Sequence, residues 1–210
     1  MREAVKGDAA RAAQFHVAGI NEGYLATLGQ RFLCRLYARM VASRHAFLIV
    51  AYEPREGVAN ATRPVIGFVA GTESVSALYR EFLVKDSVIA GIGSAPRLLR
   101  SIPRLVETLR YGAGESQSEE RSDDQESELL SIAVAAEARN RGAGALLVDA
   151  FRSAAVRSGS RSARVVVGAE NDGAIRLYRN AGFVEAERFE LHPGTASLLL
   201  RADLSDQCPR

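Results

Sequence analysis

The feature that most constrains this chain is an apolar strand that runs through a glycine-rich turn into a helix. The segment reads LLSIAVAAEARNRGAGALLVDAF, in which the predicted strand ends at Val134 and the predicted helix spans residues 142–158. Consecutive backbone N–H groups at a helix start can surround a phosphate, and the helix dipole favours its negative charge. Glycines let the backbone approach such a ligand closely. We therefore expect the turn to bind a diphosphate.

Two familiar phosphate-binding motifs do not explain this turn. A Walker loop ends in Gly-Lys-Ser/Thr, whereas the chain continues Gly144-Ala145-Leu146. A Rossmann fingerprint that starts at Gly142 requires a small residue where the chain has Leu147, and an acidic residue about 20 positions further on at a strand end. The chain meets neither requirement.

A third interpretation rests on a family resemblance. The spacing Arg139-x-x-Gly142-x-Gly144 after the strand resembles the acyl-CoA-binding motif of the GNAT N-acetyltransferase superfamily. The segment ENDGAIRLYRNAGF is similar to the second half of that family's pattern and supplies, at the usual spacing, Asn171, Ala174, Leu177, Tyr178, Gly182 and Phe183. The two matches cover residues 128–183. On this basis the chain is identified as a member of the superfamily.

The hydrophobic patterning predicts an α/β domain of mixed α+β type. The expected helices span residues 8–18, with Asp8 as the N-cap, and 25–40, 142–158 and 172–180, with helical pieces over 75–111. The expected strands span residues 2–5, 46–52, 64–71, 128–134, 163–167, 183–191 and 197–202. The resemblance implies a GNAT-like fold, in which helices flank a mostly antiparallel twisted central sheet with one splayed parallel strand pair, 128–134 and 163–167.

Charge is unevenly distributed along the chain. Residues 112–127 hold six acids and one arginine, a net charge of −5, so the rest carries +7 although the whole chain has a formal charge of +2. We expect this segment to be a disordered acidic loop within one domain over residues 1–210, and residues 205–210 to be a flexible tail. The near-neutral total, without an aromatic stack or a recognition-helix motif, argues against a nucleic-acid partner.

Several other classes are disfavoured by composition. Cys34 and Cys208 lie in neither a CxxC nor a His-rich spacing, so we expect no metal site and no disulfide framework. The segment MREAVKGD has no apolar signal-peptide core, and no run approaches the roughly 18 apolar residues of a membrane span. We therefore expect a cytoplasmic protein without a membrane partner.

The resemblance implies acetyl-CoA as the acyl donor, held where the two parallel strands splay apart. Backbone groups of the first strand would pair with the pantetheine arm, and N–H groups of the turn would hold the diphosphate. Two arginines of the turn would add charge, and an asparagine would contact the cofactor, cap the following helix, or do both. The implied cofactor-binding residues are Ile132, Ala133, Val134, Arg139, Asn140, Arg141, Gly142, Ala143, Gly144, Ala145, Asn171 and Tyr178.

Attack of an amine on a thioester requires removal of a proton, stabilisation of an oxyanion and protonation of the departing thiolate. The resemblance implies Tyr178 as the acid, with packing against the sheet as its alternative role, and the Val134 N–H as the oxyanion donor. The chain lacks the carboxylate that some relatives carry within residues 163–167. Glu128 is therefore the candidate base, and Ser131 is a candidate ligand of a water molecule or of the amine. If Glu128 is instead a solvated charge, a chain of water molecules would take the proton.

Two classes of function follow from these residues. The first is direct acetyl transfer in a ternary complex to the primary amine of a small molecule, with a protein or peptide amine as a variant. The second is a non-catalytic acyl-CoA-binding or regulatory domain. Arg97, Arg100 and Arg104 would share a helical face that either receives an anionic acceptor or is merely solvated. Members of the family are often dimers, so a homodimer is compatible with the resemblance.

Overall fold

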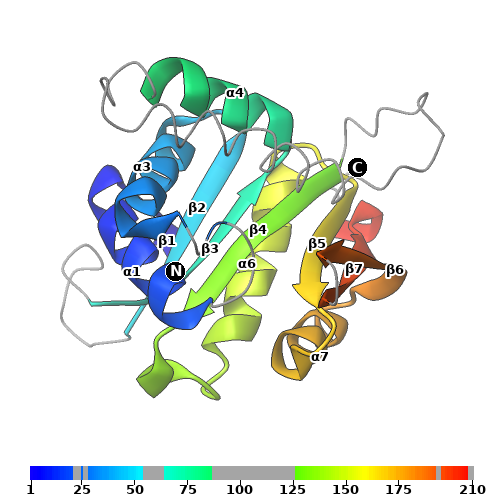
Figure 1. Cartoon of the computed structure of the whole chain (residues 1–210). Helices are drawn as coiled ribbons and strands as arrows, with labels where there is room; N and C mark the ends of the chain where they lie inside the picture. Colours follow the sequence, from blue (N-terminus) through cyan, green and yellow to red (C-terminus); the bar gives the residue numbers. More distant parts are fainter. Residues whose placement is uncertain (21–24, 26–27, 54–63, 87–125, 193–194, 208–210) are drawn as a thin grey trace.

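The strands of the protein form one twisted mixed sheet (Figure 1). The computed structural model describes residues 1–20, 25, 28–53, 64–86, 126–192 and 195–207. The sheet has the order β1-β2-β3-β4-β5-β7-β6, and only its β4–β5 pair is parallel among the described strands. The strands are β1 (Arg2–Glu3), β2 (Ala46–Tyr52), β3 (Val65–Thr72), β4 (Glu126–Val134), β5 (Ser162–Gly168), β6 (Val184–His192) and β7 (Thr195–Asp203). This arrangement confirms the predicted mixed sheet.

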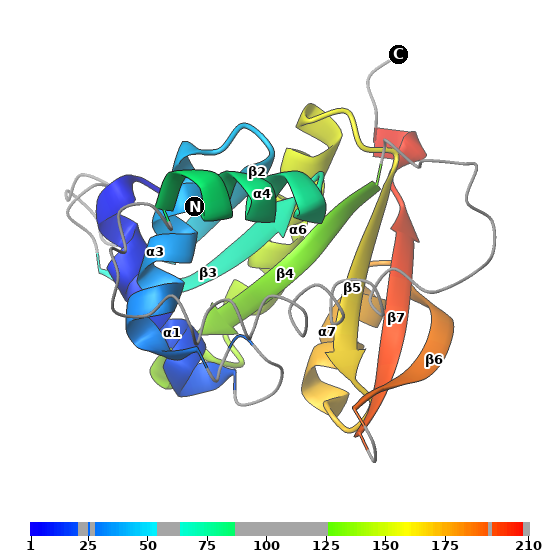
Figure 2. The same ribbon diagram turned by 45° about the horizontal axis from the view of Figure 1, so that its top comes forward.

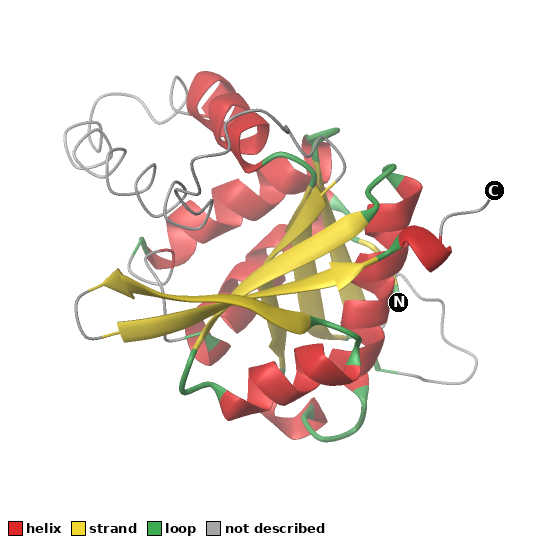
Figure 3. Cartoon of the chain, turned by 90° about the vertical axis from the view of Figure 1, so that its right-hand side faces the viewer, coloured by secondary structure: helices red, strands yellow, loops and turns green. Residues whose placement is uncertain are grey.

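Helices cover both faces of this sheet (Figure 3). One face packs against α1 and α3, with α4 beside α3, and the other packs against α6 and α7. The helices are α1 (Ala9–Gly19), α3 (Gly29–Ala42), α4 (Val75–Asp86), α6 (Ala143–Arg157) and α7 (Asp172–Asn180). Three short 3-10 helices complete the described elements: η1 (Lys6–Asp8), η3 (Ala136–Ala138) and η4 (Ser205–Gln207).

The two faces of the sheet are filled by alternate residues of the same strands. Ile49 and Val69 belong to the apolar cluster under α6, whereas Val50 and Phe68 belong to the cluster under α1 and α3. Side chains of a strand point to opposite faces in turn, so a strand buried on both sides reads as a continuous apolar run. The runs at β2 and β3 are apolar for this reason.

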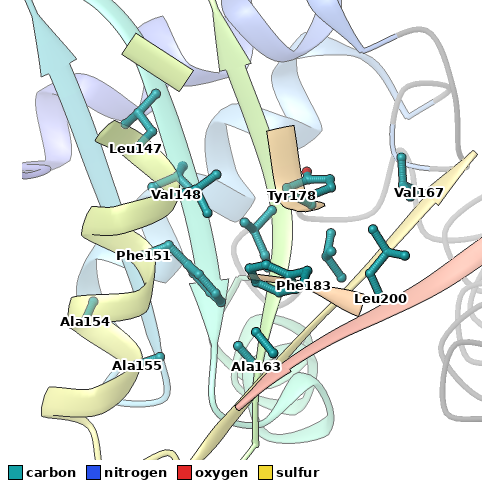
Figure 4. Close-up of a cluster of buried hydrophobic side chains, with 14 of the residues drawn as sticks. Leu147, Val148, Phe151, Ala154, Ala155, Ala163, Val167, Tyr178, Phe183 and Leu200 are labelled. Atoms are coloured by element: carbon teal, nitrogen blue, oxygen red, sulfur yellow. The ribbon is translucent and has the colours of Figure 1, made fainter. Parts of the chain in front are cut away.

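The core under α6 is built from α6, β5, β7 and the segment that follows α7 (Figure 4). Leu147, Val148 and Phe151 of α6 are fully buried, and Phe183 is 1% exposed. Burying a side chain of this size stabilises a fold by about 1.5–3 kcal/mol relative to leaving it in water. This cluster therefore fixes the position of α6 relative to the sheet.

Two glycines of β3 are required by close packing. A Cβ atom at Gly67 would lie 2.8 Å from the carbonyl oxygen of Ala133 on β4. At Gly71 it would lie 2.6 Å from the ring of Phe47 and 2.7 Å from that of Phe151. Because such distances are shorter than any normal contact, only glycine lets β3 pair closely with β4 while large rings pack over it.

The structure corrects two predictions at the amino-terminal helices. The helix expected over residues 25–40 begins at Gly29, because the φ of 79° at that glycine interrupts right-handed helical geometry. Asp8 occupies the N-cap position of α1, as expected, but its side chain accepts no capping hydrogen bond from the helix. Its carboxylate accepts a hydrogen bond from the Val5 N–H at 2.8 Å and pairs with Arg2 at 2.6 Å, so it closes the preceding turn instead.

The boundaries of the predicted acidic loop and tail also change. Residues 126–127, expected in the loop, belong to β4, because Glu126 pairs with arginines of β5 and β7 and the Ser127 hydroxyl hydrogen-bonds that of Ser160 at 2.8 Å. Residues 205–207 of the predicted tail form η4. The rest of the acidic loop and the three arginines at 97, 100 and 104 lie outside the described residues. Among the described residues no helix is long and apolar enough to cross a bilayer.

Candidate active site

The parallel strands β4 and β5 diverge halfway along their length (Figures 1 and 2). Their pairing covers only Glu126–Leu129 on β4 and Ser162–Val165 on β5. Beyond that point β4 continues to pair with β3, and β5 with β7. Among the described residues, the edge of β4 that faces β5 is therefore unpaired over residues 130–134, as the resemblance implies for a splayed pair. We call this opening the wedge.

The direction of the backbone groups in the wedge follows from the register of β3 and β4. Val134 lies opposite Gly67, and the N–H of the next residue, Ala135, donates to the Ile66 carbonyl at 2.8 Å. In an antiparallel pair this places Val134 at a non-hydrogen-bonded position, with its own N–H and C=O pointing away from β3. Ile132, two residues earlier, shares that direction, whereas the groups of Ala133 point toward β3. Two of the three expected strand residues therefore present backbone groups to the wedge.

A β-bulge reorients β4 where the wedge begins. Ala70 lies opposite Ser131 and Gly71 opposite Leu129, so Leu130 is an extra residue without a partner. The bulge changes which face each side chain meets. Leu129 belongs to the cluster under α6, whereas Ala133, four residues later, belongs to the cluster under α1 and α3.

The turn before α6 has the backbone geometry expected of an anion site. Gly142 adopts a φ of 80° and Asn140 a φ of 59°. No side chain caps α6, and in the described part of the chain the N–H groups from Asn140 to Ala145 donate to no other residue. Gly144 differs: a Cβ there would lie 3.4 Å from Leu177 of α7, which is an ordinary van der Waals distance. Gly142 thus shapes the turn, whereas Gly144 lies where α6 meets α7.

The two arginines of the turn are both exposed, but they are held differently. Arg139 Nε donates to the Val134 carbonyl at 3.2 Å, and its Nη2 lies 3.4 Å from where a Cβ of Gly19 would stand. Its guanidinium therefore lies against the end of β4. For Arg141 the structure shows no ion pair or hydrogen bond to another described residue. Both add positive charge to the turn, and Arg139 holds its charge at the open end of β4.

Tyr178 lies on α7, on the side of the sheet covered by α6. Its side chain is 4% exposed, and its ring packs on Phe183 with centroids 5.8 Å apart (Figure 4). Burial raises the pKa of Tyr178, so the phenol is protonated at neutral pH. Its hydroxyl makes no hydrogen bond to any described residue. The packing role and the acid role are thus both compatible with its position.

Asn171 has the capping role that the sequence allows. Its side-chain oxygen accepts a hydrogen bond from the N–H of Ala174 at 3.2 Å, so it is the N-cap of α7. The capping half of the prediction is confirmed. Contact with a cofactor stays a prediction.

Glu128 lies at the closed end of the wedge, one residue before the strands part. Its Oε2 accepts hydrogen bonds from Arg164 on β5, at 2.9 Å from Nε and 2.7 Å from Nη2. Burial raises the pKa of Glu128, and the charge of Arg164 opposes that rise. The side chain is only 16% exposed, so its interpretation as a solvated charge is wrong. No described residue donates a hydrogen bond to Oε1.

Glu128 and Tyr178 lie on opposite faces of the sheet. Val165 and Val167 of β5 point into the cluster that contains Tyr178, so the alternate residue Arg164, with Glu128, points to the other face. The structure therefore does not bring the candidate acid and base together on one surface. It places them on either side of the plane in which the wedge opens.

Ser131 follows the bulge and is 6% exposed. Its hydroxyl interacts with that of Tyr37 on α3, which in turn contacts His16 on α1. Sequence reasoning missed both of these partners, because each stands in the apolar pattern of its helix. They are 21 residues apart, and no local spacing connects them. Among the described residues no group of three His, Cys, Asp or Glu side chains could hold a metal ion.

Comparison with known proteins agrees with this geometry. The model of the Acetyltransferase (GNAT) family matches residues 42–183, more than half of the chain. The comparison with curated proteins gives no significant match.

Several solved structures share the fold. A GNAT-family protein from Desulfovibrio desulfuricans is 12% identical, with a TM-score of 0.61 and 97% of each chain covered. A spermidine N-acetyltransferase chimera from Vibrio cholerae and hSSAT is 15% identical, with a TM-score of 0.60, 100% of this chain and 97% of that chain covered. The Salmonella typhimurium protein yncA, solved with its cofactor acetyl-CoA, is 15% identical, with a TM-score of 0.58, 97% of this chain and 92% of that chain covered. From the family model and the fold together, the chain belongs to the GNAT acetyltransferase family.

Proposed function

We propose that the protein transfers an acetyl group from acetyl-CoA to the primary amine of a small molecule. One observation carries the proposal: the unpaired edge of β4 leads directly to a helix start whose N–H groups have no partner in the described chain. An elongated ligand with amide groups at one end and a diphosphate at the other matches both features. Acetyl-CoA has this chemistry.

The donor would be held mainly by backbone groups. Backbone groups of Ile132 and Val134 would pair with the pantetheine arm as a neighbouring strand does, and the Val134 N–H would be left for the thioester oxygen. The N–H groups from Asn140 to Ala145 would surround the diphosphate, with the dipole of α6 favouring its charge. Arg139 and Arg141 would add positive charge at the same end. These contacts leave the thioester beside Val134.

The chemistry would be divided between the two faces of the sheet. Glu128 Oε1 would take a proton from the amine, directly or through water, on the face covered by α1 and α3. The Val134 N–H would stabilise the negative charge that develops on the thioester oxygen as the new C–N bond forms. When the C–S bond breaks, the Tyr178 hydroxyl would give its proton to the departing sulfur. The raised pKa of Glu128 brings this carboxylate closer to the basicity that the step requires.

The nature of the acceptor has weaker support. One protein that shares the fold is a spermidine N-acetyltransferase chimera, whose named substrate is a small amine. A carboxylate oxygen to which no described residue donates, Glu128 Oε1, suits an ammonium group. We therefore propose a small-molecule amine in preference to a protein or peptide amine.

The pairing of Glu128 with Arg164 favours a second candidate function. A carboxylate held by a guanidinium is a weaker proton acceptor than a free one. If no other group takes the amine proton, the chain would bind acyl-CoA without turning it over. Such a protein would serve as an acyl-CoA-binding or regulatory domain.

A thiol-release assay tests these alternatives. Acetyl-CoA would be offered with amino sugars, amino acids, polyamines and peptides in turn, and free CoA would be measured. We expect release with at least one small amine and none with a Gly142→Val variant. Thermal stabilisation by acetyl-CoA without release for any amine would support the binding domain, and release with peptides alone would contradict the small-molecule acceptor.

A further inference from the structure

A buried polar chain crosses the apolar layer between the sheet and helices α1 and α3. His16 Nδ1 lies 2.6 Å from the Tyr37 hydroxyl. Burial raises the pKa of Tyr37, and an interaction with the Ser131 hydroxyl opposes that rise. The three residues are 2%, 1% and 6% exposed, respectively. Burying a polar group costs free energy unless it is hydrogen-bonded, so this chain of polar contacts is a specific structural link.

Tyr37 is the centre of this link. The other ring nitrogen of His16, Nε2, is buried and has no hydrogen-bond partner in the described part of the chain. Burial also lowers the pKa of His16 to about 4, so the ring is neutral at physiological pH. His16 therefore holds Tyr37 without adding a charge. The Tyr37 ring is fixed further by an edge-on contact with Phe68, with centroids 5.1 Å apart.

The other end of the link meets β4 where that strand is least supported. Ser131 directly follows the bulge at Leu130, and the wedge leaves the rest of β4 unpaired on its β5 side. Of the strands that the structure describes, only β3 pairs with this part of the backbone. A small shift of the bulge would change where the N–H groups of Ile132 and Val134 point.

We propose that Tyr37, oriented by His16, is a positioning residue that fixes the bulged segment of β4 through Ser131 and so aims the backbone groups of the wedge. The inference rests on the proposed function, because those groups would meet the thioester. Tyr37 touches no reacting atom in this account. Its effect is on geometry, and a misplacement of about 1 Å at a reacting centre can lower a rate about 100-fold.

The test compares Tyr37→Phe and Ser131→Ala with a matched control, Ser160→Ala. Ser160 is another buried serine, 2% exposed, and its hydroxyl hydrogen-bonds that of Ser127 at 2.8 Å at the closed end of β4. We expect Tyr37→Phe to lower kcat about 10- to 100-fold while the KM for acetyl-CoA changes little. Ser131→Ala should have a similar effect, and the double variant should be no slower than either single one, since both break one link. Ser160→Ala should keep the wild-type kcat.

A second readout separates this inference from the proposed function. The backbone amide chemical shifts of Ile132 and Val134, measured by NMR without ligand, should move in Tyr37→Phe and Ser131→Ala and stay in place in Ser160→Ala. This holds even if no amine supports turnover, in which case only the proposed function fails. Unchanged amide shifts in both variants, or a kcat per folded molecule equal to the wild-type value, would overturn the positioning role. If Tyr37→Phe does not fold, Ser131→Ala alone decides between these outcomes.

Discussion

The two halves of β4 differ in how their polar groups are satisfied. The first half, Glu126–Leu129, pairs with β5 along its whole length and with β3 at Glu128 and Leu129, and its two carboxylates pair with Arg164. The second half, residues 130–134, begins with a bulge and, among the described strands, is paired with β3 alone. Its N–H groups at Ile132 and Val134 point away from β3 and have no partner among the described residues.

This difference shows how one strand can serve both stability and binding. Charge pairing across β4, β5 and β7 holds the strands together at the closed end, where Arg201 also reaches Glu126 at 3.3 Å. The bulge and the absence of further β5 pairing then open the strand toward α6. The five predictions that follow test this contrast, from the largest expected effect to the smallest.

Arg164→Met should have the largest effect, and it should act on the stability of the closed half of β4. It would leave Glu126 and Glu128, whose side chains are 9% and 16% exposed, without their shared partner. Removing one member of a buried pair destabilises a fold by several kcal/mol, and we expect about 3 kcal/mol in the free energy of unfolding. Urea denaturation would measure it. Arg179→Met, which breaks the exposed pair with Glu185, is the control and should lose less than about 1 kcal/mol.

The loss in Arg164→Met should depend on pH. Burial raises the pKa of Glu128 in the folded state, and removal of Arg164 should raise it further. A carboxyl whose folded pKa lies above its unfolded value of about 4.3 makes the fold less stable as the pH rises between those two values. The loss in the free energy of unfolding should therefore be small near pH 4 and larger at pH 7. A loss that does not depend on pH would contradict its assignment to the buried carboxylate of Glu128.

Tyr178→Phe should lower the rate of acetyl transfer at the open half of β4 while leaving the fold intact. The hydroxyl makes no hydrogen bond to a described residue, and the ring would keep its packing on Phe183. We expect kcat to fall about 100-fold with little change in the free energy of unfolding or in acetyl-CoA binding. Steady-state kinetics and denaturation would be measured on the same preparation. Full activity would make Tyr178 a packing residue.

The two glycines of the turn should respond differently to the same substitution. Gly142→Ala forces a Cβ into a φ of 80°, which costs about 1–2 kcal/mol and should reduce the thermal stabilisation by acetyl-CoA. Gly144→Ala places its Cβ 3.4 Å from Leu177, an ordinary contact, so it should change stability little. Thermal melting with and without acetyl-CoA measures both effects. Equal effects at the two positions would refute the separate roles.

Asn171→Ala should have the smallest effect. It removes the cap of α7 and should lower the free energy of unfolding by about 1 kcal/mol. Thermal melting with acetyl-CoA then separates its two predicted roles. A ligand-induced shift equal to that of the wild type would leave Asn171 as a cap alone, and a smaller shift would support contact with the cofactor.

Much of this contrast can be predicted from sequence. The strand that ends at Val134 and the glycine-rich turn at residues 139–144 could be predicted because strand, turn and helix signals are local. The order of the elements predicted an α/β domain, and the family resemblance implied the mixed sheet and the opening between β4 and β5. The cap at Asn171 was also visible from its position before a helix.

Features that depend on tertiary contacts could not be predicted. Glu128 has polar neighbours in the sequence, but it becomes buried because Arg164, 36 residues later, lies beside it in the parallel pair. The link from His16 through Tyr37 joins two helices and a bulged strand. The bulge depends on how β3 and β4 pair, and the sequence of one strand alone does not show its register with another.

The most direct test of the account is a crystal structure of the protein with acetyl-CoA. We predict that the pantetheine arm lies along the open edge of β4, hydrogen-bonded to Ile132 and Val134, with the diphosphate at the N–H groups of residues 140–145. The first half of β4 should keep its pairing with β5 unchanged. Density for the ligand at any other place, or a closed β4–β5 pair alongside a bound ligand, would contradict the account.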